Sequence, residues 1–248
     1  MKRFLSGALL LAACLYFTVA IAGVERQGPT PKRDPNSTSS VAVTCSDTIV
    51  QDCGFENGPT GGVWTDASSN FGSPICSVGS CGLGASTNGS HDGTYWVWFG
   101  GISGVVEEGS ETQNVTLPAN STAQLTFWFL APVCSGDTND FIEVTMDGNQ
   151  VWTTDATDAA CGTPDPYAQI SVDVSAYADG GSHVLQFHSI TQGTSTTNFF
   201  VDDVDITTAP VAATFMPVPA LGRWGLFGLM LLVVLVAGWR LQRKRKAD

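Results

Sequence analysis

Carboxylates are the abundant charged side chains of this sequence, 23 Asp and Glu against 11 Lys and Arg. No Lys or Arg occurs between Arg33 and Arg223, whereas all but two of the 23 Asp and Glu residues lie in that interval. A surface of this kind repels nucleic acids, which are bound through Lys and Arg. Divalent cations and neutral glycans are compatible with it, and so is a plain solubilising role for surface acids.

The recognisable catalytic motifs are absent. The sequence contains no Gly-x-Ser-x-Gly, no His-Glu-x-x-His and no P-loop. The histidines are His91, His183 and His188, and the last two are five residues apart in one expected strand, so they point to opposite faces. A pair of carboxylates for glycoside hydrolysis stays open because acids are plentiful. We therefore expect no enzyme, with a secreted hydrolase as the least favoured alternative.

Aromatic side chains offer a second kind of chemistry, because flat rings on an exposed sheet face can stack against sugars. Trp96 and Trp98 share one face of an expected strand, and Trp128 lies opposite Phe127 and Phe129 on another. These three tryptophans are the candidates for a glycan-binding platform. The competing interpretation is that the rings belong to the core, where large aromatics dominate.

The N-terminus predicts export. A charged Lys2-Arg3 pair precedes the apolar run Phe4–Val19, and Ala20-Ile21-Ala22 follows with a small-x-small cleavage site. We expect residues 1–22 to be a signal peptide. The run Leu11–Cys14 also resembles a lipoprotein lipobox, which is the alternative.

Six cysteines remain after such a signal is removed. They are Cys45, Cys53, Cys76, Cys81, Cys134 and Cys161. An even number in an exported chain favours disulfides, and the competing zinc site is weak because no Cys-x-x-Cys pair is present. Proximity in the sequence favours the pairs Cys45–Cys53, Cys76–Cys81 and Cys134–Cys161.

The C-terminal region predicts a membrane anchor. The run Leu221–Trp239 contains a single charge, Arg223, and as a helix it would be about 28 Å long, close to the thickness of the hydrocarbon layer. Basic residues follow from Arg240 to Lys246. Because such residues stay on the cytoplasmic side, the chain before the helix should lie outside.

The same tail resembles the IPTL-CTERM sorting signal of Gram-negative bacteria. The matching positions are Val218, Pro219, Leu221, Trp224 and Gly225, followed by the apolar run and the basic cluster. The family's usual Thr is Ala220 here, and its usual Ser-Glu is Gly222-Arg223. The resemblance implies an exosortase-type membrane enzyme as a partner, and a location at the inner membrane with transfer to the cell surface or extracellular matrix. The alternative is an ordinary stop-transfer anchor.

The region between the predicted signal peptide and the C-terminal tail is long enough for one domain. Residues 23–40 are expected to form a disordered spacer, 41–208 a globular ectodomain, and 209–217 a linker to the tail at 218–248. The expected strands are Thr94–Phe99, Thr112–Leu117, Ala123–Leu130, Phe141–Met146, Gln150–Thr154, Ala168–Val174, His183–Ile190 and Asn198–Ile206. Their alternation and regular spacing predict an all-β fold, an antiparallel jelly-roll β-sandwich.

A second resemblance extends over Cys53–Ile206. Gly54–Gly58, Gly93–Gly101 and Phe199–Ile206 are similar to jelly-roll modules of the carbohydrate-binding and MAM-like type, which accompany secreted bacterial peptidases and surface proteins. The resemblance implies an accessory module outside the cell. It also implies a structural calcium ion shared by acids near the first and last strands.

Glu56 and Asp203 occupy those two places. Asp202 and Asp203 should point to opposite faces, so only one of them can reach the ion, and we favour Asp203. Calcium prefers six to eight oxygen ligands, which Asp92 and backbone carbonyls would complete. The alternative is that these acids cap turns and face water.

These features predict an exported cell-surface protein that presents an acidic jelly-roll module and binds glycan or matrix, with calcium as its one expected cofactor. The alternative is a purely structural or adhesive surface protein with no small ligand.

Overall fold

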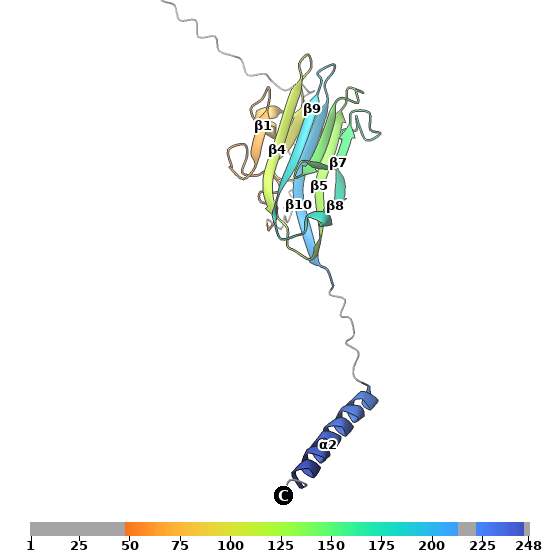
Figure 1. Ribbon diagram of the computed structural model, residues 1–248. Helices are drawn as coiled ribbons and strands as arrows, with labels where there is room; N and C mark the ends of the chain where they lie inside the picture. Colours follow the sequence, from red (N-terminus) through yellow and green to blue (C-terminus); the bar gives the residue numbers. More distant parts are fainter. Residues whose placement is uncertain (1–47, 213–221, 246–248) are drawn as a thin grey trace, which may run out of the picture. The chain divides into compact units, whose positions relative to one another are not determined.

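A computed structural model of the chain describes residues 48–212 and 222–245 (Figure 1). The chain divides into two compact units, residues 1–210 and 211–248. Three groups of predictions lie outside the described residues: the signal peptide with its spacer, Cys45, and the sorting positions Val218, Pro219 and Leu221.

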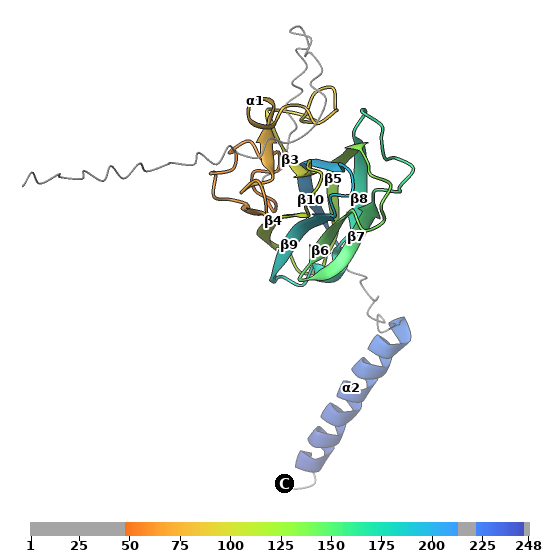
Figure 2. The ribbon, with the colours of Figure 1, turned by 90° about the horizontal axis from the view of Figure 1, so that it is seen from above.

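The described part of the first unit contains ten strands in two five-stranded antiparallel sheets (Figures 1 and 2). In order across the first sheet, the strands are β1 (Thr65–Ser68), β4 (Glu107–Thr116), β9 (Ser182–Thr191), β6 (Phe141–Met146) and β7 (Asn149–Asp155). Across the second sheet they are β2 (Ile75–Ser77), β3 (Tyr95–Gly100), β10 (Asn198–Pro210), β5 (Ser121–Val133) and β8 (Ala168–Asp173).

The strand pairing is that of a jelly roll. β3 pairs with β10, β4 with β9, β5 with β8 and β6 with β7, so the chain folds back as a nested set of antiparallel pairs. The predicted jelly-roll sandwich is confirmed, and each of the expected strands overlaps one of these eight. The short strands β1 and β2 were not predicted, because four and three residues are too few to show an alternating pattern.

The core lies between the two sheets. Leu125, Phe127 and Leu185 are fully buried, because the two-residue period of their strands turns them toward the opposite sheet. The ring of Phe127 on β5 meets that of Phe187 on β9 edge to face, with centroids 5.2 Å apart. This contact joins the second sheet to the first, and burial of each such ring contributes roughly 2–3 kcal/mol.

Two predicted disulfides are confirmed. Cys76–Cys81 closes the short helix α1 (Val78–Cys81) against β2, and Cys134–Cys161 ties the end of β5 to the loop after β7. Cys53 is also disulfide-bonded.

Helix α2 (Arg223–Arg245) covers most of the predicted membrane span. No helix of the residues described is both long and apolar enough to cross a membrane, so the predicted span over 221–239 is not supported.

Candidate functional site

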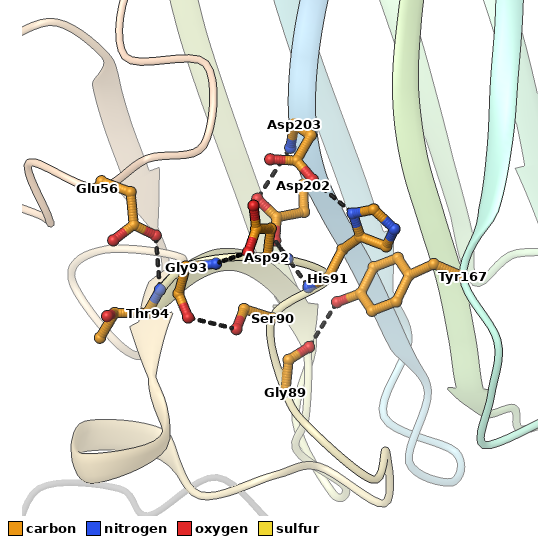
Figure 3. A network of polar contacts seen from close by, with 10 residues as sticks. All are labelled: Glu56, Gly89, Ser90, His91, Asp92, Gly93, Thr94, Tyr167, Asp202 and Asp203. Carbon is orange, nitrogen blue, oxygen red and sulfur yellow. Dashed lines mark hydrogen bonds and ion pairs between the residues drawn. The ribbon is translucent and has the colours of Figure 1, made fainter. Parts of the chain in front are cut away.

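The acids predicted to bind calcium surround the turn at residues 91–93, beside β10 (Figure 3). The fully buried Asp202 accepts hydrogen bonds from the backbone N–H of His91 at 2.8 Å and of Asp203 at 2.8 Å. Burial, with added repulsion from Asp203, raises the pKa of Asp202 well above its ordinary value. Through these hydrogen bonds Asp202 holds the turn at residues 91–93 against β10.

The prediction that only one of the two adjacent acids reaches this place was wrong. Asp203 has a left-handed backbone with φ of 50°, and the register of β10 against β5 shifts between Asp202 and Asp205. This irregularity breaks the strict alternation of side chains. Asp203 consequently also faces the turn, where its Oδ2 lies 2.5 Å from Nδ1 of His91. His91 was not among the predicted site residues.

Glu56 and Asp92 are engaged with backbone N–H groups. Oε1 of Glu56 accepts hydrogen bonds from Thr94 at 2.7 Å and Tyr95 at 2.9 Å, and Oδ1 of Asp92 accepts one from Gly93 at 2.7 Å. Gly93 has a φ of 60°, and a Cβ atom there would lie 2.2 Å from Oε1 of Glu56. Glycine is thus required for the carboxylate of Glu56 to close over the turn.

The fit of a cation to these acids can be judged from their charges. Burial raises the pKa of Asp203, the hydrogen bond from His91 opposes this, and repulsion from Asp92 and Glu56 adds to the increase. A bound cation would relieve that repulsion. Within residues 48–212 and 222–245, however, no three His, Cys, Asp or Glu side chains are placed to hold a metal ion. Calcium stays a prediction.

The predicted tryptophan platform is largely wrong. Trp96 and Trp98 are fully buried on the outer face of β3, where the loop at residues 82–93 covers them. Glycines let this loop approach closely: a Cβ atom at Gly84 would lie 2.7 Å from the ring of Trp98, and one at Gly89 would lie 2.7 Å from that of Trp96.

Trp128 alone of the three remains half-buried. One face of its ring is stacked on His91, with centroids 3.9 Å apart and the planes inclined by 15°. Little of the predicted sugar platform is therefore left on the second sheet.

The outer face of the first sheet carries a groove of about 660 Å³. It is lined by polar side chains that alternate with the core residues of β4, β9 and β6. They include Glu108, Ser110, Glu143, Thr145, Gln186 and His188. The strand register places Ser110, His188 and Glu143 in one row across the sheet, with Gln186 and Thr145 paired in the next row.

His188 stands between two carboxylates in this groove. Its Nδ1 lies 3.1 Å from Oε1 of Glu143, and its Nε2 lies 3.0 Å from Oε1 of Glu108. The second oxygen of Glu143 accepts a hydrogen bond from Nε2 of Gln150 at 2.8 Å. This cluster was not predicted, because its members are far apart in the chain and Glu108 lies before the strand expected at 112–117.

Thr145 lines the groove, and its hydroxyl is unpaired. The residue is 6% exposed, and its Oγ1 is buried with no hydrogen-bond partner in the described part of the chain. Buried polar atoms of this kind are rare, because leaving one unpaired costs about 1–3 kcal/mol. A ligand hydroxyl in the groove would supply the missing partner once a rotation of the Thr145 side chain exposes its oxygen.

A second unpaired group lies on the opposite, inner face of β4. Glu111 is fully buried, and neither carboxylate oxygen has a partner among the residues that the structure describes. Burial, followed by repulsion from Asp66 directly across on β1, raises the pKa of Glu111 to about 9. Glu111 is therefore a neutral acid inside the fold.

Comparisons with known proteins give only distant similarities. The sequence matches no protein-family model and no curated protein. Similar solved structures include the carbohydrate-binding module TmCBM61 in complex with β-1,4-galactotriose, with a TM-score of 0.46, 16% identity and coverage of 65% of this chain and 98% of that one. The K1 cleaved adhesin domain of Lys-gingipain from Porphyromonas gingivalis has a TM-score of 0.41, 16% identity and coverage of 62% and 95%.

A Stig cyclase from Fischerella sp. TAU is similar to the same degree, with a TM-score of 0.41, 14% identity and coverage of 65% and 97%. These proteins differ in what they do, and the scores are too low to carry an argument about function. The fold assignment therefore rests on the strand order of the chain itself.

Proposed function

We propose that this chain is an exported binding module that holds a segment of polysaccharide in the groove of the first sheet. The observation that carries the proposal is the buried hydroxyl of Thr145, which lies at a polar groove and has no partner within the described residues. The groove volume of about 660 Å³ falls within the range of roughly 300–1,000 Å³ that is typical of ligand sites.

The groove chemistry matches a ligand rich in hydroxyl groups. Ser110 and Thr145 offer hydroxyls, Gln186 offers an amide, and Glu143 offers carboxylate oxygens. Together these groups can both donate hydrogen bonds to sugar hydroxyls and accept them. Since no Lys or Arg lies between residues 33 and 223, sulfated or phosphorylated polysaccharides are not expected to bind.

Export and surface display are part of the proposal. The disulfides Cys76–Cys81 and Cys134–Cys161 support export, because such bridges persist outside reducing compartments. Display at the cell surface or in the matrix, with an exosortase-type enzyme as the processing partner, rests on the sequence of the tail alone.

A structural or adhesive protein without a saccharide ligand is the second candidate. The burial of Trp96 and Trp98 favours it, because the expected stacking platform is closed. Catalysis is not part of the proposal. Both Glu108 and Glu143 contact the ring of His188, which occupies the space that a glycosidic bond would need between two catalytic carboxylates.

Thr145→Val tests the proposal. We would measure retention of the purified full-length protein on a panel of insoluble neutral polysaccharides. We expect the wild type to be retained on at least one of them, and Thr145→Val to bind that one several-fold more weakly. Because the substitution removes an unpaired buried hydroxyl, the unfolding midpoint should stay the same or rise.

Thr126→Val is the matched control, since Thr126 faces outward on β5 of the second sheet. It should leave retention unchanged. If the wild type is retained on no polysaccharide, neutral or amine-bearing, the saccharide proposal fails and the structural candidate replaces it. If Thr145→Val and Thr126→Val weaken retention equally, the groove is not the binding site.

A further inference from the structure

We infer that the groove selects polysaccharides that carry free amino groups. This inference rests on the proposed saccharide function and names the class of sugar that the site recognises. It follows from the charges of Glu108, Glu143 and His188, which the neutral hydrogen-bonding groups of the groove do not balance.

The groove is negatively charged in either protonation state of His188. A neutral imidazole has one N–H and can donate to only one of its two carboxylate neighbours, whereas an imidazolium donates to both. With two carboxylates, the cluster carries a charge of about −2 in the first case and about −1 in the second. Gln150 donates a hydrogen bond to Glu143 but adds no charge.

Among the described residues that line the groove, His188 is the only one that can carry a positive charge. The sequence has no Lys or Arg between residues 33 and 223. Glu107, another acid of β4, accepts hydrogen bonds from Ser69 and Asn70. A cationic ligand would therefore meet two carboxylates whose negative charge is balanced at most by the one imidazolium of His188.

The geometry favours an organic cation over a metal ion. Glu108 and Glu143 contact opposite nitrogens of the His188 ring, so their oxygens do not converge on one point. In the described ranges no group of three possible metal ligands occurs. An ammonium group has three N–H donors and can bond to one carboxylate and a neighbouring oxygen at the same time.

The groups around the carboxylates favour an amino sugar over a basic peptide. Thr145 and Gln186 lie in the row next to Glu143 and His188, so a ligand with hydroxyls beside its amine would satisfy both rows. A lysine side chain would bring an aliphatic stem past the unpaired hydroxyl of Thr145 and leave it unpaired. A 2-amino sugar carries an ammonium group and hydroxyls on one rigid ring.

The test compares two oligosaccharides of equal length, one of glucosamine and one of N-acetylglucosamine. Affinity of the full-length protein for each would be measured by calorimetry at about pH 6, where the amines are largely protonated. We expect the glucosamine oligomer to bind about tenfold more tightly or better, because charge-assisted hydrogen bonds are the stronger ones. Glu143→Gln and Glu108→Gln should each reduce that preference several-fold.

Asp173→Asn is the matched control. It removes one negative charge from β8 of the second sheet, and the amide oxygen can still accept the hydrogen bond from the backbone of Ser175. This variant should keep the full preference for the free amine. If it loses as much preference as Glu143→Gln, the effect is general charge attraction and the inference is overturned.

The remaining outcomes separate the inference from the proposed function. Equal affinity of the wild type for both oligosaccharides overturns the amino-sugar inference and leaves saccharide binding in place. Competition by a lysine oligomer as strong as that by the glucosamine oligomer also overturns the inference, because the groove would then recognise charge alone. Binding of neither oligosaccharide, together with no retention on neutral polysaccharides, removes the proposed function itself.

Discussion

Replacing Glu111 with Gln should stabilise the folded domain and flatten its response to pH. Glu111 points into the core from β4, and neither of its carboxylate oxygens has a partner among the described residues. Burial, and then the charge of Asp66, raises its pKa from 4.5 to about 9. Gln has the shape and neutrality of the protonated acid, so the substitution removes the titration with little change in packing.

The sign and size of the effect follow from the two pKa values. Between pH 4.5 and about 9, the unfolded chain has released the Glu111 proton and the folded chain still holds it. The free energy of unfolding therefore falls as pH rises through this window, by up to about 1.4 kcal/mol per pH unit. At pH 7 the loss amounts to about 3 kcal/mol, and below pH 4.5 it vanishes.

Urea unfolding followed by tryptophan fluorescence at pH 5, 6, 7 and 8 would measure this effect, with the disulfides kept oxidised. The stability advantage of Glu111→Gln over the wild type should grow from below about 1 kcal/mol at pH 5 to about 3 kcal/mol at pH 7. Glu108→Gln is the control, because Glu108 lies exposed on the outer face of the same strand. An advantage that stays constant with pH, or a loss of stability at pH 7, would refute the argument.

Three further predictions concern the rest of the molecule. Replacing both Cys134 and Cys161 with Ser opens a loop of 27 residues and should lower the free energy of unfolding by about 3–4 kcal/mol, measured in urea. The hydrogen bond that His183 donates to the carboxylate of Asp147 is the main cause that raises the pKa of His183 above 6.5. The stabilisation from this bond is present below pH 6.5 and is lost as pH rises through the folded-state value; an NMR titration that finds a pKa below 6.5 would contradict this. If calcium binds as the sequence predicts, adding it should raise the melting temperature and Asp203→Asn should abolish the rise, whereas equal melting in calcium and in chelator would rule the ion out.

Much of the fold could be predicted because strand patterns are local. Leu125, Phe127 and Phe129 recur at every second residue, and this two-residue period alone assigns them to one face of β5. The same argument located β9, and the regular spacing of strands indicated a sandwich. Strand ends were less certain: β4 begins at Glu107, five residues before the expected start.

Whether a sheet face is exposed could not be predicted, because exposure depends on the conformation of the loops that can cover it. Alternation correctly placed Trp96 and Trp98 on one face of β3 but could not show that the loop at 82–93 closes over them. The loop can cover the two rings only because Gly84 and Gly89 have no side chain. In the sequence, nothing distinguishes these two glycines from glycines of ordinary turns.

The groove could not be predicted for a different reason. Glu108, Glu143 and His188 lie on three strands that are distant in the sequence, and the register of β9 against β4 and β6 decides that they meet. A shift of one residue in either pairing would turn a carboxylate away from the imidazole. The sequence pattern indicates which residues of a strand share a face. It does not indicate which residues of two strands are paired across the sheet.

The jelly-roll topology places Asp203 and the groove in different sheets. Nested pairing puts β4, β9 and β6 in the first sheet, which carries the groove, and puts β10 in the second sheet, where Asp203 meets the turn at 91–93. A cation at Asp203 would lie beside the last strand and would not line the groove. If calcium binds there, its effect is to hold that turn to β10. Saccharide binding through Glu143 and Thr145 should therefore persist in Asp203→Asn as long as the variant remains folded.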